Sequence, residues 1–242
     1  MQKISVIIPA YNEAVHIENN IKEVINVFKD YNYKYEIIIV DDGSVDDTYA
    51  EALKVGRQHP HIIVKRNMRN YGKGRALKKG VRFATGDYIA FLDADMELHP
   101  GQIQTFFDIM HLDDADLVIG SKMHPNSKVI YPFHRKVVSM IYYFIIWFLF
   151  DLPTRDTQTG LKLFKAEVPK RVFPKILIKK FAYDIELLAV AHRMGYKIAE
   201  APIVLDSKRR WGRIGFKAIY DTWVDTMAIW YRMYILHWYD KK

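Results

Sequence analysis

The amino-acid sequence predicts an α/β fold in which a mostly parallel β-sheet carries helices on both faces. Three observations predict it. Short β-branched or aromatic runs alternate with helix-period segments over the first 120 residues. Hydrophobic residues make up 50% of the 242 residues, which is enough for one good core with an appendage. Polar clusters follow three of the predicted strands, at the sheet edge where α/β proteins bind ligands.

Five buried strands are expected, each a short apolar run that ends in polar or glycine-rich residues. They are residues 4–8, 36–40, 62–65, 88–92 and 116–119. Helices are expected at residues 16–31, 46–59 and 73–84. In the first of these, apolar residues recur at helical spacing on one face, as in a helix packed on a sheet. Strands and helices that alternate in this way form parallel sheets.

The second half of the chain carries most of the positive charge. Residues 1–120 hold 14 Lys and Arg against 18 Asp and Glu, whereas residues 121–242 hold 22 against 10. A basic half would fit nucleic acid. However, four of the five tryptophans lie in the last 32 residues among tyrosines, a composition typical of a membrane–water interface. We therefore expect a membrane surface and no nucleic acid as partner, with a helix packed on its own core as the alternative.

Two apolar segments in this half predict helices. The run 137–150, VVSMIYYFIIWFLF, has 14 uncharged residues, whereas a membrane-spanning helix needs roughly 20. It predicts an interfacial helix at about 134–150, or else a buried core helix. A second helix is expected at 216–239, where polar residues recur near each helical turn and the rest is aromatic or aliphatic. That helix could pack on lipid or on a second copy of the chain.

The sequence has no cysteine, which excludes disulfides and thiolate metal ligands and suits a reducing cytoplasm. Residues 1–9 have the pattern of a strand and not of a secretory signal, so the protein is expected to stay where it is made. Any metal must be held by carboxylates or histidines. The nine histidines, however, show no metal-ligand spacing.

Three carboxylates lie within five residues after the fourth predicted strand. Asp93, Asp95 and Glu97 could converge on one divalent ion, and oxygen ligands beside a phosphate-bearing substrate favour Mg²⁺ or Mn²⁺. Such an ion would stabilise the charge on a departing diphosphate. An Asp-x-Asp pair alone is a weak signal, because two surface aspartates in a loop are common. Its position at a strand end strengthens it.

Two further segments could meet a nucleotide. Asp41 and Asp42 follow the second predicted strand, where a carboxylate can accept hydrogen bonds from a base or ribose; alternatively they belong to the N-cap assembly of the next helix. Residues 70–76, NYGKGRA, fit neither the dinucleotide-binding nor the Walker spacing. Glycines that open a helix still let an anion approach the backbone, where Lys73 or Arg75 could reach it.

Four motifs occur in a fixed order: VIIPAYNE, VDDGS, NYGKGRAL and FLDADMELHP. In this order they resemble the inverting family 2 glycosyltransferases, which have the GT-A fold. The segments VIGSK (118–122) and DTQTGLKLF (156–164) resemble one group in that family, the polyprenyl-phosphate sugar synthases, namely dolichyl-phosphate glucosyl- and mannosyltransferases. The resemblance covers roughly residues 3–213.

The resemblance implies a nucleotide-sugar donor and positions for its contacts. The base, ribose and phosphate contacts would be Pro9, Tyr11, Glu13, Asp41, Asp42, Lys73, Gly74 and Asp93. The metal, Mg²⁺ or Mn²⁺, would be held by Asp95 and Glu97 together with Asp93.

For the acceptor, the resemblance implies that Lys122 and Arg135 bind a lipid phosphate. An arginine of a C-terminal loop would close over the donor diphosphate, and the candidates are Arg209, Arg210 and Arg213. Asp184 occupies the place of a base that deprotonates a sugar hydroxyl. A phosphate acceptor is already an anion at pH 7, so Asp184 could orient the donor sugar instead, or make a buried structural hydrogen bond.

The sequence therefore predicts a GT-A catalytic domain at residues 1–210, which includes the helix at 134–150, and an aromatic amphipathic membrane-surface helix at 211–242. The predicted reaction is a metal-dependent, inverting transfer of a hexose, with UDP-glucose favoured as donor, to a polyprenyl phosphate at the cytoplasmic face of a membrane. The first alternative is transfer to a glycan or glycerolipid hydroxyl with Asp184 as general base. The second is an inactive membrane-docking scaffold. A homo-oligomer formed through the C-terminal helix is a further expectation left open.

Overall fold

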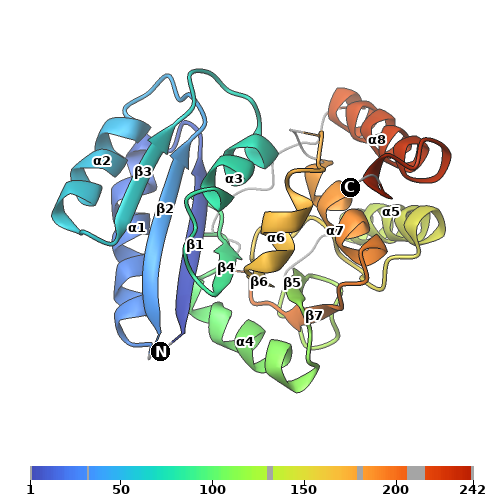
Figure 1. Cartoon of the computed structure of the whole chain (residues 1–242), viewed down its shortest axis with the longest axis horizontal. Helices are drawn as coiled ribbons and strands as arrows, with labels where there is room; N and C mark the ends of the chain where they lie inside the picture. The colour runs from blue at the N-terminus through green and yellow to red at the C-terminus, as the bar shows by residue number, and fades with distance from the viewer. Residues whose placement is uncertain (1, 32, 130–132, 179–181, 206–215, 241–242) are drawn as a thin grey trace.

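The computed structural model describes residues 2–31, 33–129, 133–178, 182–205 and 216–240, without side chains at 133–136 and 216–219. Within these residues, helices cover both faces of a seven-stranded sheet (Figure 1). The strands are β1 (Lys3–Ala10), β2 (Lys34–Asp41), β3 (Ile62–Arg66), β4 (Tyr88–Phe91), β5 (Leu117–Ser121), β6 (Lys162–Lys165) and β7 (Ile198–Pro202). Their order in the sheet is β3-β2-β1-β4-β6-β5-β7. The predicted α/β class with a mostly parallel sheet is confirmed.

The sheet is parallel except at one strand. β6 runs antiparallel to both of its neighbours, β4 and β5, while the other pairs are parallel. All five predicted strands form, with ends shifted by at most three residues. β6 and β7 were not predicted. β6 has only four residues and carries a lysine at each end, so its sequence lacks the apolar run by which a buried strand is recognised.

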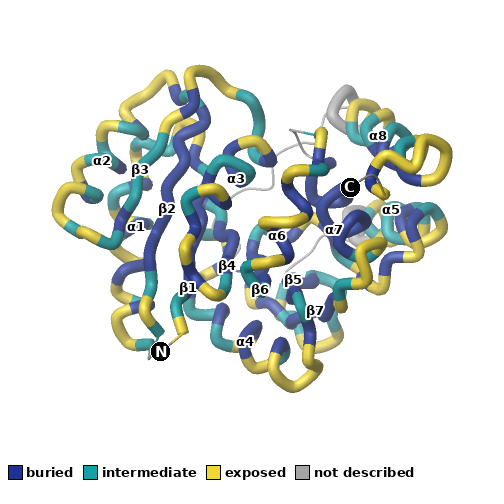
Figure 2. Tube along the Cα trace, viewed as in Figure 1, coloured by how far each residue is buried: buried dark blue, intermediate teal, exposed yellow. Residues whose placement is uncertain are grey.

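The helices fall into two groups on opposite faces of the sheet. They are α1 (Ala14–Lys29), α2 (Thr48–Gln58), α3 (Lys73–Val81), α4 (Ile103–Leu112), α5 (Phe133–Phe150), α6 (Glu167–Val172), α7 (Tyr183–Arg193) and α8 (Phe216–Trp230). A short 3₁₀ turn, Pro100–Gln102, precedes α4. One buried cluster joins the sheet to α1, α2 and α4. The other joins it to α3, α6 and α7, and α5 and α8 also contribute side chains to this second cluster. In Figure 2 the strands β1 and β2 are buried for most of their length, as parallel strands covered on both faces must be.

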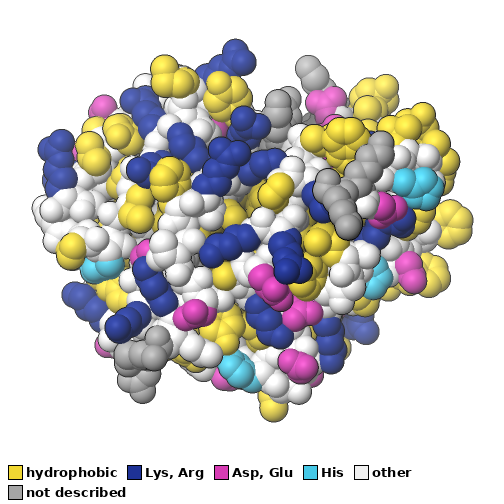
Figure 3. Space-filling model, in the orientation of Figure 1, with side chains coloured by type: hydrophobic (Ala, Val, Ile, Leu, Met, Phe, Trp, Pro, Cys, Tyr) yellow, Lys and Arg dark blue, Asp and Glu magenta, His cyan; other side chains and the backbone are white. Residues whose placement is uncertain are grey.

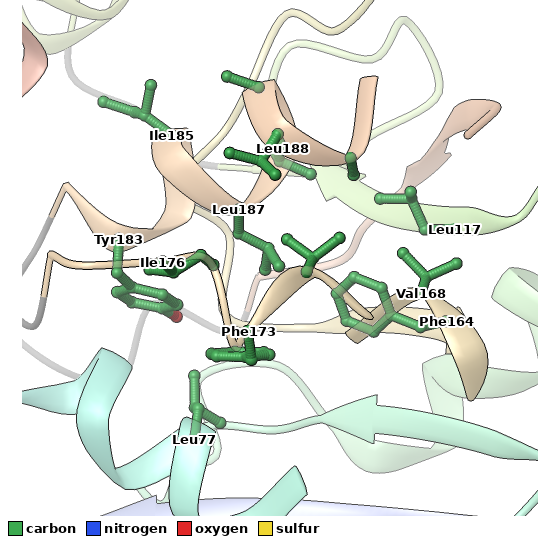
Figure 4. Close-up of a cluster of buried hydrophobic side chains, with 14 of the residues drawn as sticks. Leu77, Leu117, Phe164, Val168, Phe173, Ile176, Tyr183, Ile185, Leu187 and Leu188 are labelled. Carbon is green, nitrogen blue, oxygen red and sulfur yellow. The ribbon is translucent and has the colours of Figure 1, made fainter. Parts of the chain in front are cut away.

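The second cluster holds the C-terminal half of the chain together. Figure 4 shows Phe173, which follows α6, between Leu187 of α7 above it and Leu77 of α3 below it, with Phe164 of β6 to one side. These side chains are at most 2% exposed, and full burial of each contributes about 1.5–3 kcal/mol. α7, which carries Asp184, is therefore fixed against the sheet by packing along most of its length.

The C-terminal segment turns where the sequence predicted one continuous helix over 216–239. The α-helix ends at Trp230, a π-helical turn follows at Tyr231–Ile235, and a 3₁₀ turn at Trp238–Asp240 ends the described chain. The aromatic periodicity continues across this turn, so the pattern alone did not reveal it. Because of the turn, Tyr239 is buried in the same cluster as α7 and its hydroxyl donates a hydrogen bond to Glu186 Oε1 at 2.5 Å.

Candidate active site

A first pocket lies at the carboxyl ends of three adjacent parallel strands, β2, β1 and β4. Its volume is about 460 Å³. It is lined by Pro9, Ala10, Tyr11, Glu13, Asp42, Asn70, Gly72, Lys73, Asp93, Ala94 and Asp95. Parallel strands place their following loops at this edge, which is why loops distant in sequence meet here. The structure thus brings together most of the residues expected to contact a nucleotide.

Asp42 organises one wall of the first pocket. Its carboxylate accepts hydrogen bonds from Gly72 N at 2.7 Å, from Tyr71 N at 3.2 Å and from Asn67 Nδ2 at 2.7 Å. Gly72 has a φ of +96°, a backbone conformation that residues other than glycine rarely adopt. The carboxylate and the glycine together set the path of the loop that leads into α3.

Two of the expected nucleotide contacts do not line the first pocket. Asp41 is fully buried, where its carboxylate accepts a hydrogen bond from Ser44 N at 3.1 Å and pairs with Arg66 Nε at 3.0 Å. Gly74 is buried in the first turn of α3. Contacts of Asp41 and Gly74 with a nucleotide therefore stay predictions.

A close ion pair joins α3 to the loop after β4. Lys73 Nζ lies 2.5 Å from Asp93 Oδ1. Burial alone would lower the pKa of Lys73, but the Asp93 carboxylate raises it above its ordinary value, with a smaller contribution from Asp184. In the same way burial alone would raise the pKa of Asp93, and Lys73 lowers it, helped by Lys162 and Lys122. Both side chains are therefore charged at neutral pH.

A second, smaller pocket of about 70 Å³ adjoins the first. The three carboxylates Asp93, Asp95 and Glu97 line it, together with Leu98, Lys122, Gln158, Thr159, Gly160, Leu161 and Leu205. A tight turn brings the carboxylates to one pocket: Met96 has a φ of +53° and its N–H donates to Asp93 O at 3.2 Å. Among the described residues, no group of three or more carboxylates or histidines is arranged to hold a metal ion. The predicted metal ligands thus share a pocket without forming a complete coordination site.

The segment 156–160 closes the second pocket from the other side. Asp156 accepts hydrogen bonds from Lys122 N at 3.1 Å, Gln158 N at 3.0 Å and Thr159 Oγ1 at 2.8 Å. A Cβ placed on Gly160 would lie 2.0 Å from Asp93 Oδ2, a distance that non-bonded atoms cannot adopt. Asp93 is therefore packed directly against the Gly160 backbone, which only glycine permits here.

Asp184 is engaged in a buried ion pair. Its Oδ1 lies 2.5 Å from Nζ of Lys162, a β6 residue with no exposed surface. The Lys162 ammonium also donates to the Thr159 carbonyl at 2.5 Å. Asp184 lines neither pocket and is linked to the second one through Lys162 and Thr159; the sequence analysis did not single out this lysine partner.

A third pocket of about 390 Å³ adjoins the second and contains Lys122. One wall is polar and comes from residues 122–127 and 154–158; the other is the inner face of α5, with Ser139, Tyr142, Tyr143 and Ile146 at helical spacing. Burial raises the pKa of the Tyr142 phenol to about 12, so it stays a neutral hydroxyl. Arg135 belongs to α5, but its side chain is not among those described; Arg209 and Arg213 lie outside the described residues.

The opposite face of α5 is apolar and exposed. Met140, Ile141, Phe144, Trp147 and Phe148 point to solvent, and Phe148 is 81% exposed. Further exposed apolar side chains extend this surface over the C-terminal segment: Tyr220, Trp223, Val224, Tyr231, Tyr234, Ile235, Leu236 and Trp238. In Figure 3 hydrophobic side chains gather over α8 and α5. In the described part of the chain, no helix has both the length and the apolar character needed to span a bilayer.

Residues 5–173 match a protein-family model whose description is "Glycosyl transferase family 2". The match covers more than two thirds of the chain and includes the strand-end residues of the first two pockets. The chain belongs to glycosyl transferase family 2. The family resemblance inferred from the four motifs is thereby confirmed.

Curated relatives of this family 2 chain include dolichyl-phosphate beta-glucosyltransferases. The Dictyostelium discoideum protein is 32% identical over 213 residues, which are 83% of this chain and 65% of the relative. The Homo sapiens protein is 29% identical over 222 residues, which are 84% of this chain and 67% of the relative. The chain therefore spans slightly less than two thirds of the first of these relatives.

Solved structures of another protein show the same fold. Glucosyl-3-phosphoglycerate synthase from Mycobacterium tuberculosis, in complex with Mn²⁺, UDP-glucose and phosphoglyceric acid, aligns with a TM-score of 0.71 at 19% identity, over 95% of this chain and 79% of that one. Its complex with Mg²⁺ and UDP aligns with a TM-score of 0.70 at 20% identity, over 95% and 78%. The predicted GT-A fold is confirmed by these alignments.

Two site features of this family 2 chain escaped the sequence analysis. Lys162 lies between two leucines, and a charge inside an apolar run signals a buried partner, although the sequence does not tell which carboxylate it meets. Asp156 caps the turn beneath Lys122. An aspartate followed three residues later by a threonine often forms such a turn, so the Asp-x-x-Thr spacing could have indicated this role. Lys162 acts on the site from below the pocket surface, whereas Asp156 lines the third pocket.

Proposed function

We propose that this chain transfers a hexose, with UDP-glucose favoured as donor, to a polyprenyl phosphate at a membrane surface, with inversion of the anomeric carbon. The observation that carries the proposal is the continuity of the three pockets. The first and second share Asp93 and Asp95, and the second and third share Lys122 and Gln158. The transfer reaction needs the nucleotide, the leaving diphosphate and the acceptor to lie side by side in this order, one in each pocket. The names of the dolichyl-phosphate beta-glucosyltransferase relatives support the same donor and acceptor classes.

In this proposal the first pocket binds the nucleoside diphosphate. The half-exposed Tyr11 ring offers a face for the base, and Glu13 and the Asp42 wall offer acceptors for hydroxyl groups. Lys73 remains cationic beside Asp93 and lies where the first pocket meets the second, which suits a diphosphate. The donor sugar then extends toward Asp184 and the second pocket.

The three carboxylates of the second pocket fit a hard divalent cation. They supply oxygen ligands, and the lack of a complete protein site is expected, because Mg²⁺ is usually held by one or two carboxylates plus substrate phosphates. Asp95 and Glu97 would hold Mg²⁺ or Mn²⁺, with Asp93 beside them. The bound metal would supply positive charge to the leaving diphosphate. Asp93, whose pKa is lowered, keeps its negative charge at neutral pH.

The third pocket suits an amphiphilic anion. Lys122 stands at its junction with the second pocket, and the Asp156 carboxylate fixes the Lys122 backbone N–H. The aromatic inner face of α5 forms the apolar wall for the first part of a prenyl chain. A phosphate monoester has a second pKa near 6, so its oxygen attacks the anomeric carbon as an anion while the bond to the diphosphate breaks. The nucleoside diphosphate leaves with the electron pair, and no proton moves.

The Lys162–Asp184 pair favours this acceptor over a hydroxyl group. A hydroxyl acceptor needs a base, and Asp184 is the candidate. The Oδ1 atom of Asp184 already accepts a hydrogen bond from the Lys162 ammonium, so this oxygen is not available to take a proton from an acceptor. Orientation of the donor sugar requires no proton transfer. The alternative with Asp184 as general base is therefore the weaker proposal.

The exposed face of α5 would rest in the lipid interface. This face and the pocket-lining face lie on opposite sides of one helix, so an acceptor whose chain is in lipid needs only to bring its phosphate past α5. Aromatic and aliphatic side chains of the C-terminal segment enlarge the same surface, a mixture that suits the headgroup region.

A transfer assay tests the proposed function. Purified chain is incubated with a short polyprenyl phosphate, Mg²⁺ or Mn²⁺, and radiolabelled UDP-glucose, UDP-N-acetylglucosamine or GDP-mannose in separate reactions. We expect label from one donor, UDP-glucose, to enter the organic phase, and Asp95→Ala to abolish the transfer. Binding of nucleotide without any labelled lipid would contradict the polyprenyl acceptor and direct the search to glycan or glycerolipid hydroxyls.

A further inference from the structure

Lys162 is a fully buried cation directly beneath the second pocket. In the sheet register it pairs with Phe91 of β4 and with Ile119 of β5, so it lies between the strands that lead to the carboxylates and to Lys122. Its side chain is 1% exposed and does not line any of the three pockets. A substrate therefore does not reach Lys162 itself.

The ammonium of Lys162 joins two parts of the site. One hydrogen bond, to Asp184 Oδ1, holds the first turn of α7. The other, to the Thr159 carbonyl, holds the turn whose next residue, Gly160, is packed against the Asp93 carboxylate. A single side chain thus fixes Asp184 and the backbone that supports Asp93.

Stability alone does not explain a lysine at this position. A buried ion pair is often no more stable than well-packed apolar side chains of the same volume. Phe164, two residues along β6 and therefore on the same face as Lys162, is fully buried in a core that would accept another apolar side chain. The pair is better explained by what it holds in place.

We propose that Lys162 is a positioning residue of the transfer reaction, which holds the Asp184 carboxylate in the place where it accepts hydrogen bonds from the donor sugar. This inference rests on the proposed function and names a residue that acts through another one. Lys162 sets the position of the carboxylate and takes no part in bond making. In this proposal Asp184, whose side chain is 6% exposed against 1% for Lys162, is the member of the pair that meets the sugar.

A double-mutant cycle with Asp184 tests the proposal. The variants are Lys162→Met, Asp184→Asn and the two combined, and the matched control is Lys165→Met, which removes the other lysine of β6 and its pair with Asp116 outside the three pockets. We expect Lys162→Met to lower kcat by about 100-fold, the effect of a misplaced reacting group, and to raise the KM for the donor by about 10-fold. In the Asp184→Asn background the same substitution should change kcat by less than about 3-fold, because coupled sites are not additive. Lys165→Met should keep kcat.

A second readout does not depend on the acceptor. The affinities for UDP and for UDP-glucose are measured by calorimetry for each variant. Lys162→Met and Asp184→Asn should both reduce the affinity for UDP-glucose relative to UDP by about 10-fold, which corresponds to loss of hydrogen bonds to the sugar, and leave the affinity for UDP unchanged. If wild type fails to glycosylate prenyl phosphate but shows this pattern, the proposed acceptor is wrong and the role of Lys162 stands.

Three results would overturn the role of Lys162. One is a Lys162→Met variant with a kcat close to wild type. Another is additivity in the cycle: Lys162→Met would lower kcat by the same factor in the Asp184→Asn background as it does in the wild type. The third is equal loss of UDP and UDP-glucose affinity, as general damage to the fold would give. If Lys162→Met does not fold because Asp184 is left unpaired, the comparison of Asp184→Asn with the double variant, in which both charges are removed, decides the question.

Discussion

The two ends of the site are built in different ways. The first pocket consists of short loops after β1, β2 and β4, and a buried carboxylate, Asp42, fixes one of these loops through backbone N–H groups. The third pocket has a helix, α5, as one wall, and the other side of that helix is exposed and apolar. The first pocket is thus shaped by polar hydrogen bonds, and the third is bounded by a helix whose outer face is apolar. In the proposed function the first pocket is the donor end and the third is the acceptor end.

The region between the two ends explains how they work together. The second pocket takes Asp93 from the donor side and Lys122 from the acceptor side, and Gly160 is packed against the first while Asp156 holds the second. Substitutions at the donor end or in this middle region should therefore affect catalysis. Substitutions on the outer face of α5 should affect only attachment to lipid. The predictions below test this division from the largest expected effect to the smallest.

Asp93→Ala should have the largest effect. It leaves Lys73 without its partner and removes a carboxylate from the middle pocket. We expect kcat to fall by about 10²–10³-fold, the effect of losing a single preorganised charged group. The measurement is initial rate of transfer. Asp114→Ala, at a carboxylate that is 95% exposed, should leave the rate unchanged; equal rates for both variants would contradict a role for Asp93.

Gly160→Ala should lower activity by about 100-fold and stability by about 1–3 kcal/mol, because the new methyl group overlaps Asp93. Urea unfolding and initial rates measure the two effects. The control is Gly195→Ala, where the φ is +85° but no atom lies within 4 Å of the new Cβ. That variant should lose about 1–2 kcal/mol of stability and keep its activity. Full activity of Gly160→Ala would disprove the close contact.

Phe148→Glu should weaken binding to lipid vesicles without touching the pockets. Removing one buried aromatic side chain from the interface loses about 1.5–3 kcal/mol, or about 10–100-fold in affinity. Vesicle sedimentation measures this, and calorimetry should show the same affinity for UDP as wild type. Leu112→Glu, at an equally exposed position at the end of α4, should bind vesicles normally. If both variants bind vesicles alike, the α5 surface does not face lipid.

Tyr239→Phe should destabilise the chain by about 1–3 kcal/mol, because Glu186 loses a buried hydrogen-bond donor. Burial raises the pKa of Tyr239, helped by the charge of Glu186, so the hydroxyl is a donor throughout the physiological range. Thermal unfolding measures the effect. Tyr220→Phe, at an exposed tyrosine of α8, is the matched control and should unfold like wild type.

The smallest effect is expected at Asp240. The hydrogen bond from Arg193 lowers the pKa of this carboxyl to about 2 from an ordinary value of 3.8. Because the folded-state pKa is the lower one, the pair stabilises the fold above pH 3.8 and the contribution disappears as the pH falls toward 2. The side chains are partly exposed, so the contribution is at most about 1 kcal/mol. Asp240→Asn should unfold at lower stability at pH 6 and match wild type near pH 2, as followed by urea titration.

The donor end could be predicted from the sequence and the acceptor end only in part. Strands such as residues 4–8 can be predicted from their continuous apolar runs. The polar residues that follow these strands meet because parallel strands end at the same edge of the sheet. β6 is different, since its short sequence has a lysine at each end and its position depends on long-range pairing with β4 and β5. The burial of Lys162 and the turn after Trp230 are tertiary effects of the same kind. Neither feature can be predicted from the helical or strand periodicity of the local sequence.

The most direct test of the central claim compares a phosphate with a hydroxyl as nucleophile. Initial rates are measured for a short prenyl phosphate and for the corresponding prenol, at equal concentration in the same detergent, with wild type and with Asp184→Asn. We predict transfer to the phosphate at a rate at least about 100-fold above that to the alcohol, because the bound phosphate is already an anion and no general base is required. We also predict that Asp184→Asn retains measurable transfer to the phosphate. Faster transfer to the prenol, abolished in Asp184→Asn, would contradict this account and assign Asp184 as the base.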